Sequence, residues 1–271
     1  MEKEKPIILV TNDDGPQAGG IKALLEVVRP LGEVYAVIPA EGQSGMSHAI
    51  TVRKPIFIER EIHRKDFHYY EVSGTPVDCV KLAIHTLLPR RPDLILSGIN
   101  HGSNASVNVI YSGTMGAALE GAINRIPSVG FSINSFSPDA DFTDAAVIAG
   151  MITRQVLENP GMICLNVNIP AVPGDQIKGI QICRQTAGYW SEDFEPVEPQ
   201  NGKPGYLLTG VFHNAEPETP GTDEWALRQG YVAIVPVHPD FTSHEEIEPL
   251  ARWNLEEMFF ELKTVLTRYK R

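Results

Sequence analysis

The sequence lacks the features of secreted, membrane-spanning and disulfide-stabilised proteins. Its 3 cysteines, Cys79, Cys164 and Cys183, form no CxxC pair and are odd in number, which indicates buried thiols in a reducing compartment. No run of 18 apolar residues occurs, and the 4 apolar residues after Pro6 are too few for the core of a signal peptide. We therefore expect a cytoplasmic protein.

An excess of basic residues is also absent. The formal net charge is −11, which argues against nucleic acid or an anionic membrane as a partner, because both require a basic face. With 42% hydrophobic and 21% charged residues, the 271-residue chain has the composition of an ordinary globular protein with a full core.

What the chain does contain is an alternation of apolar runs and helical patterns. A helical repeat of apolar residues over 21–28 lies between short apolar runs at 7–10 and 34–38, which predicts a β-α-β unit with a right-handed crossover. Further strands are predicted at 94–96, 129–132 and 162–167, and further helices at 75–87, 112–124 and 141–158. Five strands that alternate with helices predict a doubly wound α/β domain.

Two segments depart from this alternation. Residues 50–72 alternate apolar and polar and predict a short antiparallel excursion. Residues 173–225 are rich in Pro, Gly and Glu, a further strand is predicted at 231–235, and a helix with a wide apolar face begins at about Ile247. We therefore divide the chain into a catalytic core, 1–172, and an extension, 173–271, that does not fold alone and contacts another subunit.

Polar residues follow the predicted strands where each strand ends. Asn12, Asp13 and Asp14 come directly after the first strand, Ser44 lies in the loop after the second, and Asn100 follows the third. Because ligands of open α/β sheets bind beyond the carboxyl ends of the strands, we expect these side chains to converge. Their donors are all oxygens, which select Mg²⁺, Mn²⁺ or Ca²⁺ rather than Zn²⁺. The alternative is a solvated turn.

Residues 112–114 form a fourth element, at the start of a predicted helix. Unpaired N–H groups and the positive end of the helix dipole make such a terminus a seat for phosphate, which would supply the positive potential that an acidic surface lacks. The alternative is that Ser112 only caps the helix, while Gly113 and Gly116 allow close packing. His48 and His101 fit loop packing better than a role as bases, and Asp78 fits a helix start.

Five sequence blocks carry a resemblance to a known family. Residues 9–15, 43–45, 74–80, 97–104 and 111–114 resemble, in order and spacing, the signature blocks of the SurE family of stationary-phase survival proteins, metal-dependent 5'/3'-nucleotidases. Residues 230–236 resemble a further strand of that family, although Val235 stands where the family usually has Thr, and Glu41-Gly42 replaces a polar pair. Neither departure falls on a ligand.

The resemblance implies a fold and a set of site residues. It implies a Rossmann-like three-layer α/β/α core with a mostly parallel sheet, followed by an extension with a β-hairpin and a terminal helix. One Mg²⁺ or Mn²⁺ per subunit would be bound by Asp13, Asp14, Ser44 and Asn100. Asp13, Asn104 and Ser112 would support catalysis, and the phosphate would contact Asn12, Gly45, Asn104, Ser112, Gly113 and Thr114.

The implied function is hydrolysis of nucleoside 5'- and 3'-monophosphates to nucleoside and phosphate by a 5'-nucleotidase, with short polyphosphate as a further substrate. The resemblance also implies a homodimer or homotetramer that exchanges C-terminal segments. Two alternatives remain. A Mn²⁺-dependent glycosyltransferase also places paired acids beside a metal, and a non-catalytic module would bind metal and nucleotide without turnover.

Overall fold

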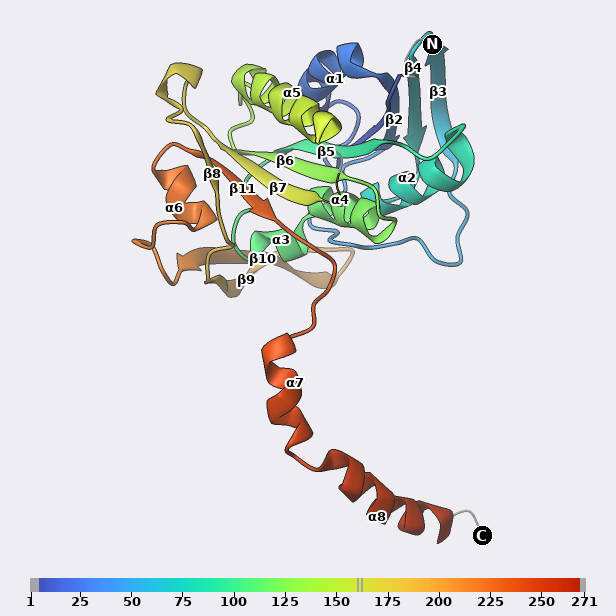
Figure 1. The fold of residues 1–271 in the computed structure, drawn as a ribbon, viewed down its shortest axis with the longest axis vertical. Helices are drawn as coiled ribbons and strands as arrows, with labels where there is room; N and C mark the ends of the chain where they lie inside the picture. Colours follow the sequence, from blue (N-terminus) through green and yellow to red (C-terminus); the bar gives the residue numbers. More distant parts are fainter. Residues whose placement is uncertain (1–4, 160, 162, 269–271) are drawn as a thin grey trace. The chain divides into compact units, whose positions relative to one another are not determined.

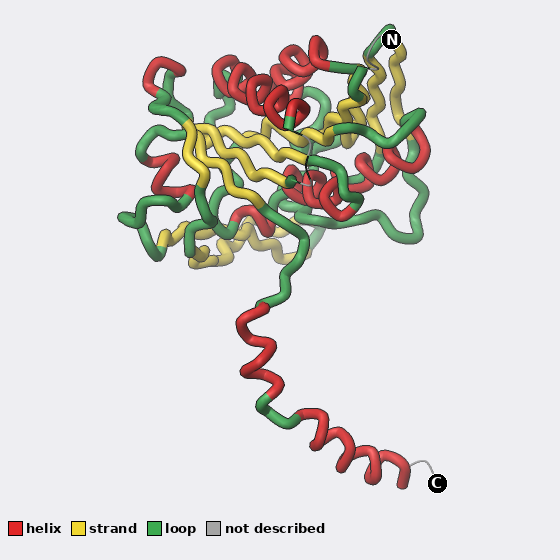
Figure 2. Tube along the Cα trace, in the orientation of Figure 1, coloured by secondary structure: helices red, strands yellow, loops and turns green. Residues whose placement is uncertain are grey.

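The computed structural model describes residues 5–159, 161 and 163–268. Its centre is a nine-stranded sheet in the order β3-β4-β2-β1-β5-β6-β7-β11-β8, counted over these residues (Figures 1 and 2). The strands are β1 Ile7–Thr11, β2 Glu33–Pro39, β3 Ile58–Arg64, β4 Phe67–Val72, β5 Leu94–His101, β6 Ser128–Asn134, β7 Cys164–Pro170, β8 Ile180–Ile182 and β11 Val232–Pro236. All neighbours pair in parallel except β3 with β4 and β11 with β7.

Helices cover both faces of this sheet (Figure 1). One face packs against α1 (Gly19–Val28) and α5 (Thr143–Glu158), and the other against α2 (Pro76–Leu82) and α4 (Gly113–Ile123). Buried strand residues alternate between the two layers: Val10 contributes to the first, Leu9 to the second. The predicted three-layer α/β/α fold with a mostly parallel sheet is therefore confirmed.

The shorter elements connect this core. They are the 3-10 helices η1 Arg29–Leu31 and η3 Gly174–Gln176, the π-helix η2 Ala83–Leu87, and the α-helices α3 Asn108–Tyr111 and α6 Asp223–Arg228. All five strands predicted in the core are present, although Met162, which the prediction included in the last of them, lies outside the described residues. In the excursion over 50–72 only residues from Ile58 onward form strands, and β4 also pairs in parallel with β2.

The extension contains the predicted hairpin, with β9 at Gly188–Gln200 and β10 at Lys203–Asn214. The chain divides into two compact units, 1–238 and 239–271. The second unit contains α7 (His244–Ala251) and α8 (Leu255–Arg268), so the predicted helix from about Ile247 is two helices. Asn254, at φ 53°, interrupts them. The function of the segment after residue 172 stays a prediction.

The topology also identifies a ligand-binding edge. From β1 the chain proceeds outward through β2 and β4 on one side, and β5, β6 and β7 follow on the other. The strand order therefore reverses between β1 and β5, and in doubly wound sheets ligands bind outside the carboxyl ends of the strands at this point. No helix within the described residues is long and apolar enough to cross a membrane.

Candidate metal and phosphate site

The paired acids lie at the reversal point of the sheet. The last residue of β1, Thr11, is level with Ser97 of β5, so residues 12–14 leave the sheet beside the last residues of β5, 98–101, which continue along β6 after an irregularity. Asn12 and Asp13 are buried and Asp14 is half-buried. Asn12 Nδ2 donates to the carbonyl of Gly15, 2.9 Å away, and this bond closes the turn that presents the two carboxylates.

Asp13 is the point where three segments meet. Its Oδ1 accepts a hydrogen bond of 2.6 Å from Thr114 Oγ1 at the start of α4, and its carbonyl accepts one of 2.6 Å from the Gln43 N–H. A Cβ on Gly113 would lie 2.9 Å from Asp13 Oδ2, so only glycine allows the helix to approach this closely. The carboxylate thus rests directly on the N-terminus of α4.

Asp14 ties the β5 loop to the same place. Its Oδ2 accepts a hydrogen bond of 3.0 Å from the backbone N–H of His101, the residue after Asn100. Asn100 Nδ2 donates to the carbonyl of Gly102, 2.7 Å away, so its amide nitrogen is engaged, and the role of Asn100 as a metal ligand stays a prediction. The other two predicted ligands are next in sequence to residues that hydrogen-bond to the acids. Ser44 follows Gln43, which bonds to Asp13, and Asn100 precedes His101, which bonds to Asp14.

The pKa values of the two acids are raised, which favours a bound cation beside them. Burial raises the pKa of Asp13 to about 6, with the Asp14 charge as a smaller contribution that the hydrogen bond from Thr114 opposes. Burial also raises the pKa of Asp14, against the hydrogen bond from His101. Two adjacent carboxylates in such a place are stabilised in their charged form by a positive ion.

The predicted helix cap at Ser112 is confirmed. Ser112 Oγ accepts a hydrogen bond of 3.0 Å from the Met115 N–H, and α4 begins at the next residue. Because this oxygen is an acceptor within the cap, the hydroxyl hydrogen of Ser112 remains available to a ligand. Thr114 directs its hydroxyl to Asp13, so a contact between Thr114 and phosphate stays a prediction.

The loop that carries Ser44 and Gly45 is exposed but anchored. Ser47 Oγ donates to the carbonyl of Ile110 at 2.7 Å, and a Cβ on Gly116 would meet the Ser47 carbonyl at 2.3 Å. Gly116 therefore serves close packing, as the alternative interpretation proposed. Ser44 is exposed, and no hydrogen bond of its side chain occurs among the described residues. Its role as a ligand stays a prediction.

Asn104 belongs to a buried polar network that the sequence analysis missed. Its Nδ2 donates to Ser132 Oγ at 2.8 Å and its backbone N–H to Asn168 Oδ1 at 2.8 Å, while its carbonyl accepts from Asn166 Nδ2 at 2.8 Å. The signal was present: Asn166 and Asn168 are polar residues two apart in an otherwise apolar buried strand, and such groups need partners. The network fixes where Asn104 stands.

The structure agrees with non-catalytic roles for Asp78, at a helix start, and for His48 and His101, in loop packing. Asp78 and Thr75 form a reciprocal capping box at the start of α2. His48 Nε2 lies 3.1 Å from Glu120 Oε2 of α4, and His101 packs edge-on against Phe142. These histidines support the loops beside the acids.

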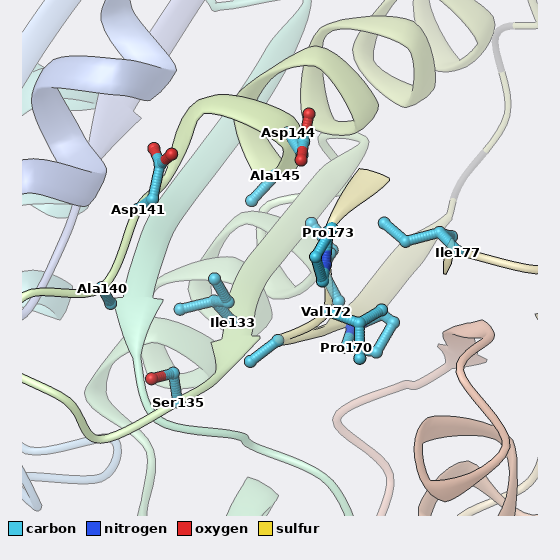
Figure 3. Close-up of a pocket in the computed structure, with 12 residues that line it drawn as sticks. Ile133, Ser135, Ala140, Asp141, Asp144, Ala145, Pro170, Val172, Pro173 and Ile177 are labelled. Atoms are coloured by element: carbon cyan, nitrogen blue, oxygen red, sulfur yellow. The ribbon is translucent and has the colours of Figure 1, made fainter. Parts of the chain in front are cut away.

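A separate hollow lies at the same end of the sheet (Figure 3). It measures about 370 Å³ and is lined by Ile133 and Pro170 at the ends of β6 and β7, and by Asp141 and Asp144 near the start of α5. Ile133 packs in the α1–α5 layer, whereas Gly113 and Thr114 belong to α4 on the other face. None of the predicted site residues lines this hollow.

Comparison with known proteins identifies the family. The family profile described as Survival protein SurE matches residues 8–192. The chain belongs to the SurE family. The 5'-nucleotidase SurE of Christiangramia forsetii is 48% identical over 261 residues, which cover 95% of this chain and 100% of that protein.

The other relatives agree with this assignment. The 5'-nucleotidase SurE of Flavobacterium johnsoniae is 48% identical and covers 94% of this chain and 99% of its own. The crystal structure of the SurE protein from Aquifex aeolicus has a TM-score of 0.77 at 36% identity, and the match covers 92% of this chain and 99% of that one. The predicted membership of the SurE family is confirmed, together with the fold it implied.

Proposed function

We propose that this chain is a 5'-nucleotidase, a phosphomonoesterase that releases phosphate from nucleoside monophosphates. The observation that carries the proposal is the hydrogen bond of 2.6 Å between Asp13 and Thr114, which joins a buried acid pair to a helix N-terminus. This contact supports a cation site on the acids that would adjoin an anion site at the helix N-terminus, as a metal-dependent phosphatase requires. The names of the family relatives support the same activity.

A divalent metal fits the residues at the site. Asp13 Oδ2, the second oxygen of Asp14, Asn100 Oδ1 and the Ser44 hydroxyl are oxygen donors of the kind that Mg²⁺ and Mn²⁺ prefer. The buried Asn12 Oδ1, which accepts no hydrogen bond within the described part of the chain, adds a further oxygen beside them. When bound, such an ion supplies positive charge against the phosphoryl oxygens and acidifies water.

The protein's own groups would then position the phosphate. The Ser112 hydroxyl and the Gly113 N–H donate toward its oxygens at the positive end of α4. Asn104 Nδ2 gives one hydrogen to Ser132 Oγ, and its second hydrogen donates to the phosphate. Asp13, held by Thr114, orients the attacking water and accepts its proton. Hydrolysis at both the 5' and 3' positions, and of short polyphosphate, extends this proposal.

The direct test is phosphate release from 5'-AMP, 3'-AMP and tripolyphosphate by metal-free protein supplied with Mg²⁺ or Mn²⁺. We expect turnover of at least 5'-AMP with either ion and its loss in EDTA. Full activity in EDTA would contradict the metal site. Tight AMP binding without phosphate release would favour the non-catalytic module, and sugar transfer from a nucleotide sugar would favour the glycosyltransferase.

We further propose that the extension mediates assembly into a homodimer or homotetramer. The hairpin β9–β10 exposes large apolar side chains, among them Tyr189, Phe194, Leu207, Leu208 and Val211. In the second unit, α7, α8 and the turn between them expose Ile247, Trp253, Met258, Phe259 and Phe260. Apolar surfaces of this size mark contacts with another chain. Light scattering should give a mass of two or four chains, and a monomer at micromolar concentration would contradict the proposal.

A further inference from the structure

A pair of histidines on the hairpin β3–β4 lies apart from the site described above. His63 of β3 and His68 of β4 stand directly opposite each other, next to the turn at residues 65 and 66 (β3 and β4 in Figure 1). The Nδ1 atoms of the two rings are 3.0 Å apart. Two imidazole nitrogens at this distance have either a proton or a metal ion in common.

The other nitrogen of each ring faces a carboxylate. His68 Nε2 is 3.1 Å from Glu33 Oε1 of β2, which also accepts a hydrogen bond of 3.0 Å from Tyr35 OH. His63 Nε2 is 3.6 Å from Glu61 Oε2. A carboxylate partner holds the proton on Nε2, so the neutral form of each ring directs a lone pair from Nδ1 toward the other ring.

Aromatic neighbours hold both rings in this orientation. His68 stacks on Tyr35 with ring centres 4.3 Å apart, and His63 meets the edge of Tyr70 at 5.4 Å. These contacts reduce the conformational entropy that the side chains would lose on binding an ion. The pair is also accessible, because the His63 side chain is 51% exposed.

From this geometry we infer that His63 and His68 form a binding site for a divalent transition-metal ion. With metal–nitrogen bonds of about 2.0–2.1 Å, two ligand nitrogens at a right angle lie about 2.9 Å apart, and at the tetrahedral angle about 3.3 Å. The observed 3.0 Å is closer to the right angle, which favours Cu²⁺ or Ni²⁺ over Zn²⁺.

The protein supplies two ligands to this site and water supplies the rest. Within the described residues no three His, Cys, Asp or Glu side chains converge on one point, so Glu33 and Glu61 act by orienting the rings and not by coordination. Such carboxylate–imidazole–metal chains are the usual outer shell of histidine ligands. The ion would bridge the edge strand of the sheet to its neighbour.

The test is a titration of metal-free protein with Cu²⁺, followed by electron paramagnetic resonance and calorimetry. The candidate catalytic site offers only oxygen ligands, so nitrogen hyperfine structure reports histidine. We expect the first equivalent of Cu²⁺ to show two nitrogen ligands. His63→Gln and His68→Gln should each reduce the spectrum to a single nitrogen and weaken binding by at least about tenfold.

Two further variants complete the design. His85→Gln, which removes an exposed histidine elsewhere, should leave the two-nitrogen spectrum and the affinity unchanged. Glu33→Gln should keep both nitrogens and weaken binding by about tenfold through the lost orientation of His68. A wild-type spectrum without two nitrogens, or equal affinity in wild type and His63→Gln, would show that the two rings have a proton in common and would overturn the metal site.

Discussion

The candidate catalytic site and the His63–His68 pair are two proposed cation sites with opposite donor types. At the carboxyl end of β1 the donors are oxygens, Asp13 is buried and Asp14 half-buried, and hydrogen bonds from the Thr114 hydroxyl and the His101 backbone N–H hold the two carboxylates in place. On the edge hairpin the donors are nitrogens, His63 is exposed and His68 half-buried, and the register of two antiparallel strands pairs them. Donor type selects hard ions at the first site and transition metals at the second.

Burial has opposite consequences at the two places. At the sheet end it raises the pKa of Asp13 and Asp14, so the metal-free fold carries a cost that an ion removes. The histidine pair is less buried, with the His63 side chain 51% exposed and the His68 side chain 21% exposed. We therefore expect that removing a buried acid at the first site raises the stability of the metal-free fold but lowers activity. Removing a histidine at the second site should change neither. Four predictions test this contrast.

The largest effect is expected for Asp13→Asn. The substitution removes a proposed ligand and the group that orients water, so kcat/KM for 5'-AMP should fall by roughly a thousandfold or more. Since burial raises the pKa of Asp13 to about 6, the metal-free variant should be more stable at neutral pH by on the order of 2 kcal/mol in urea denaturation. A variant that lost stability as well as activity would contradict the conclusion that burial of the charged Asp13 destabilises the metal-free fold.

The next effect is expected for Gly113→Ala. The added Cβ would meet Asp13 Oδ2 at 2.9 Å and displace the carboxylate, which should lower kcat by about 100-fold. Gly42→Ala is the matched control, because its Cβ would lie at an ordinary 3.7 Å from the Asp14 carbonyl. Steady-state kinetics of the two variants measure the difference. Equal activities would mean that the approach of α4 to Asp13 does not matter.

Glu120→Gln tests the support of the loop beside the acids. Burial opposes the charge of Glu120, but hydrogen bonds from His48 and Lys81 outweigh it and lower its pKa below 4.5. A carboxyl with a lowered pKa stabilises the fold above its unfolded pKa, and this contribution is lost as the pH falls. The variant should therefore lose about 2 kcal/mol near pH 7.

The pH dependence of that loss is the sharper measurement. Denaturation curves of wild type and Glu120→Gln should converge as the pH falls below 4.5, where the wild-type carboxylate takes up its proton. A difference that stays constant down to acidic pH would assign the loss to packing and not to the charge.

The smallest effect is expected for His63→Gln. The side chain lies on β3, four strands away from β5 in the order of the sheet, so turnover of 5'-AMP with Mg²⁺ should change by less than about twofold. The same variant should lose the two-nitrogen copper signal. A large loss of nucleotide turnover would show that the two sites are coupled.

Local pattern was enough to predict much of the fold. The five core strands and the caps at Thr75 and Ser112 follow from apolar periodicity and from hydrogen-bonding residues at helix starts, which act over a few residues. The break between α7 and α8 was missed, because a left-handed Asn254 leaves little trace in an apolar pattern. The pairing of β4 with β2 was missed because pairing partners are chosen by long-range contacts.

The candidate site was predicted in part for the same reason. Asp13, Asp14 and the Ser112 helix start carry their own local signals, whereas the hydrogen bond of the Thr114 hydroxyl to Asp13, 101 residues away, was not predicted. Asn166 and Asn168, which position Asn104, were not anticipated, because a polar residue in a strand does not reveal its partner.

The sequence by itself determined the class of fold and the family, and it predicted a set of oxygen donors. Those properties reside in residue types and their spacing along the chain. Only the tertiary structure decided that Asp13 rests on α4, that Asp14 holds the β5 loop, and that His63 and His68 face each other at 3.0 Å. Each of these is a contact across strand order and register, which the folded chain alone brings together.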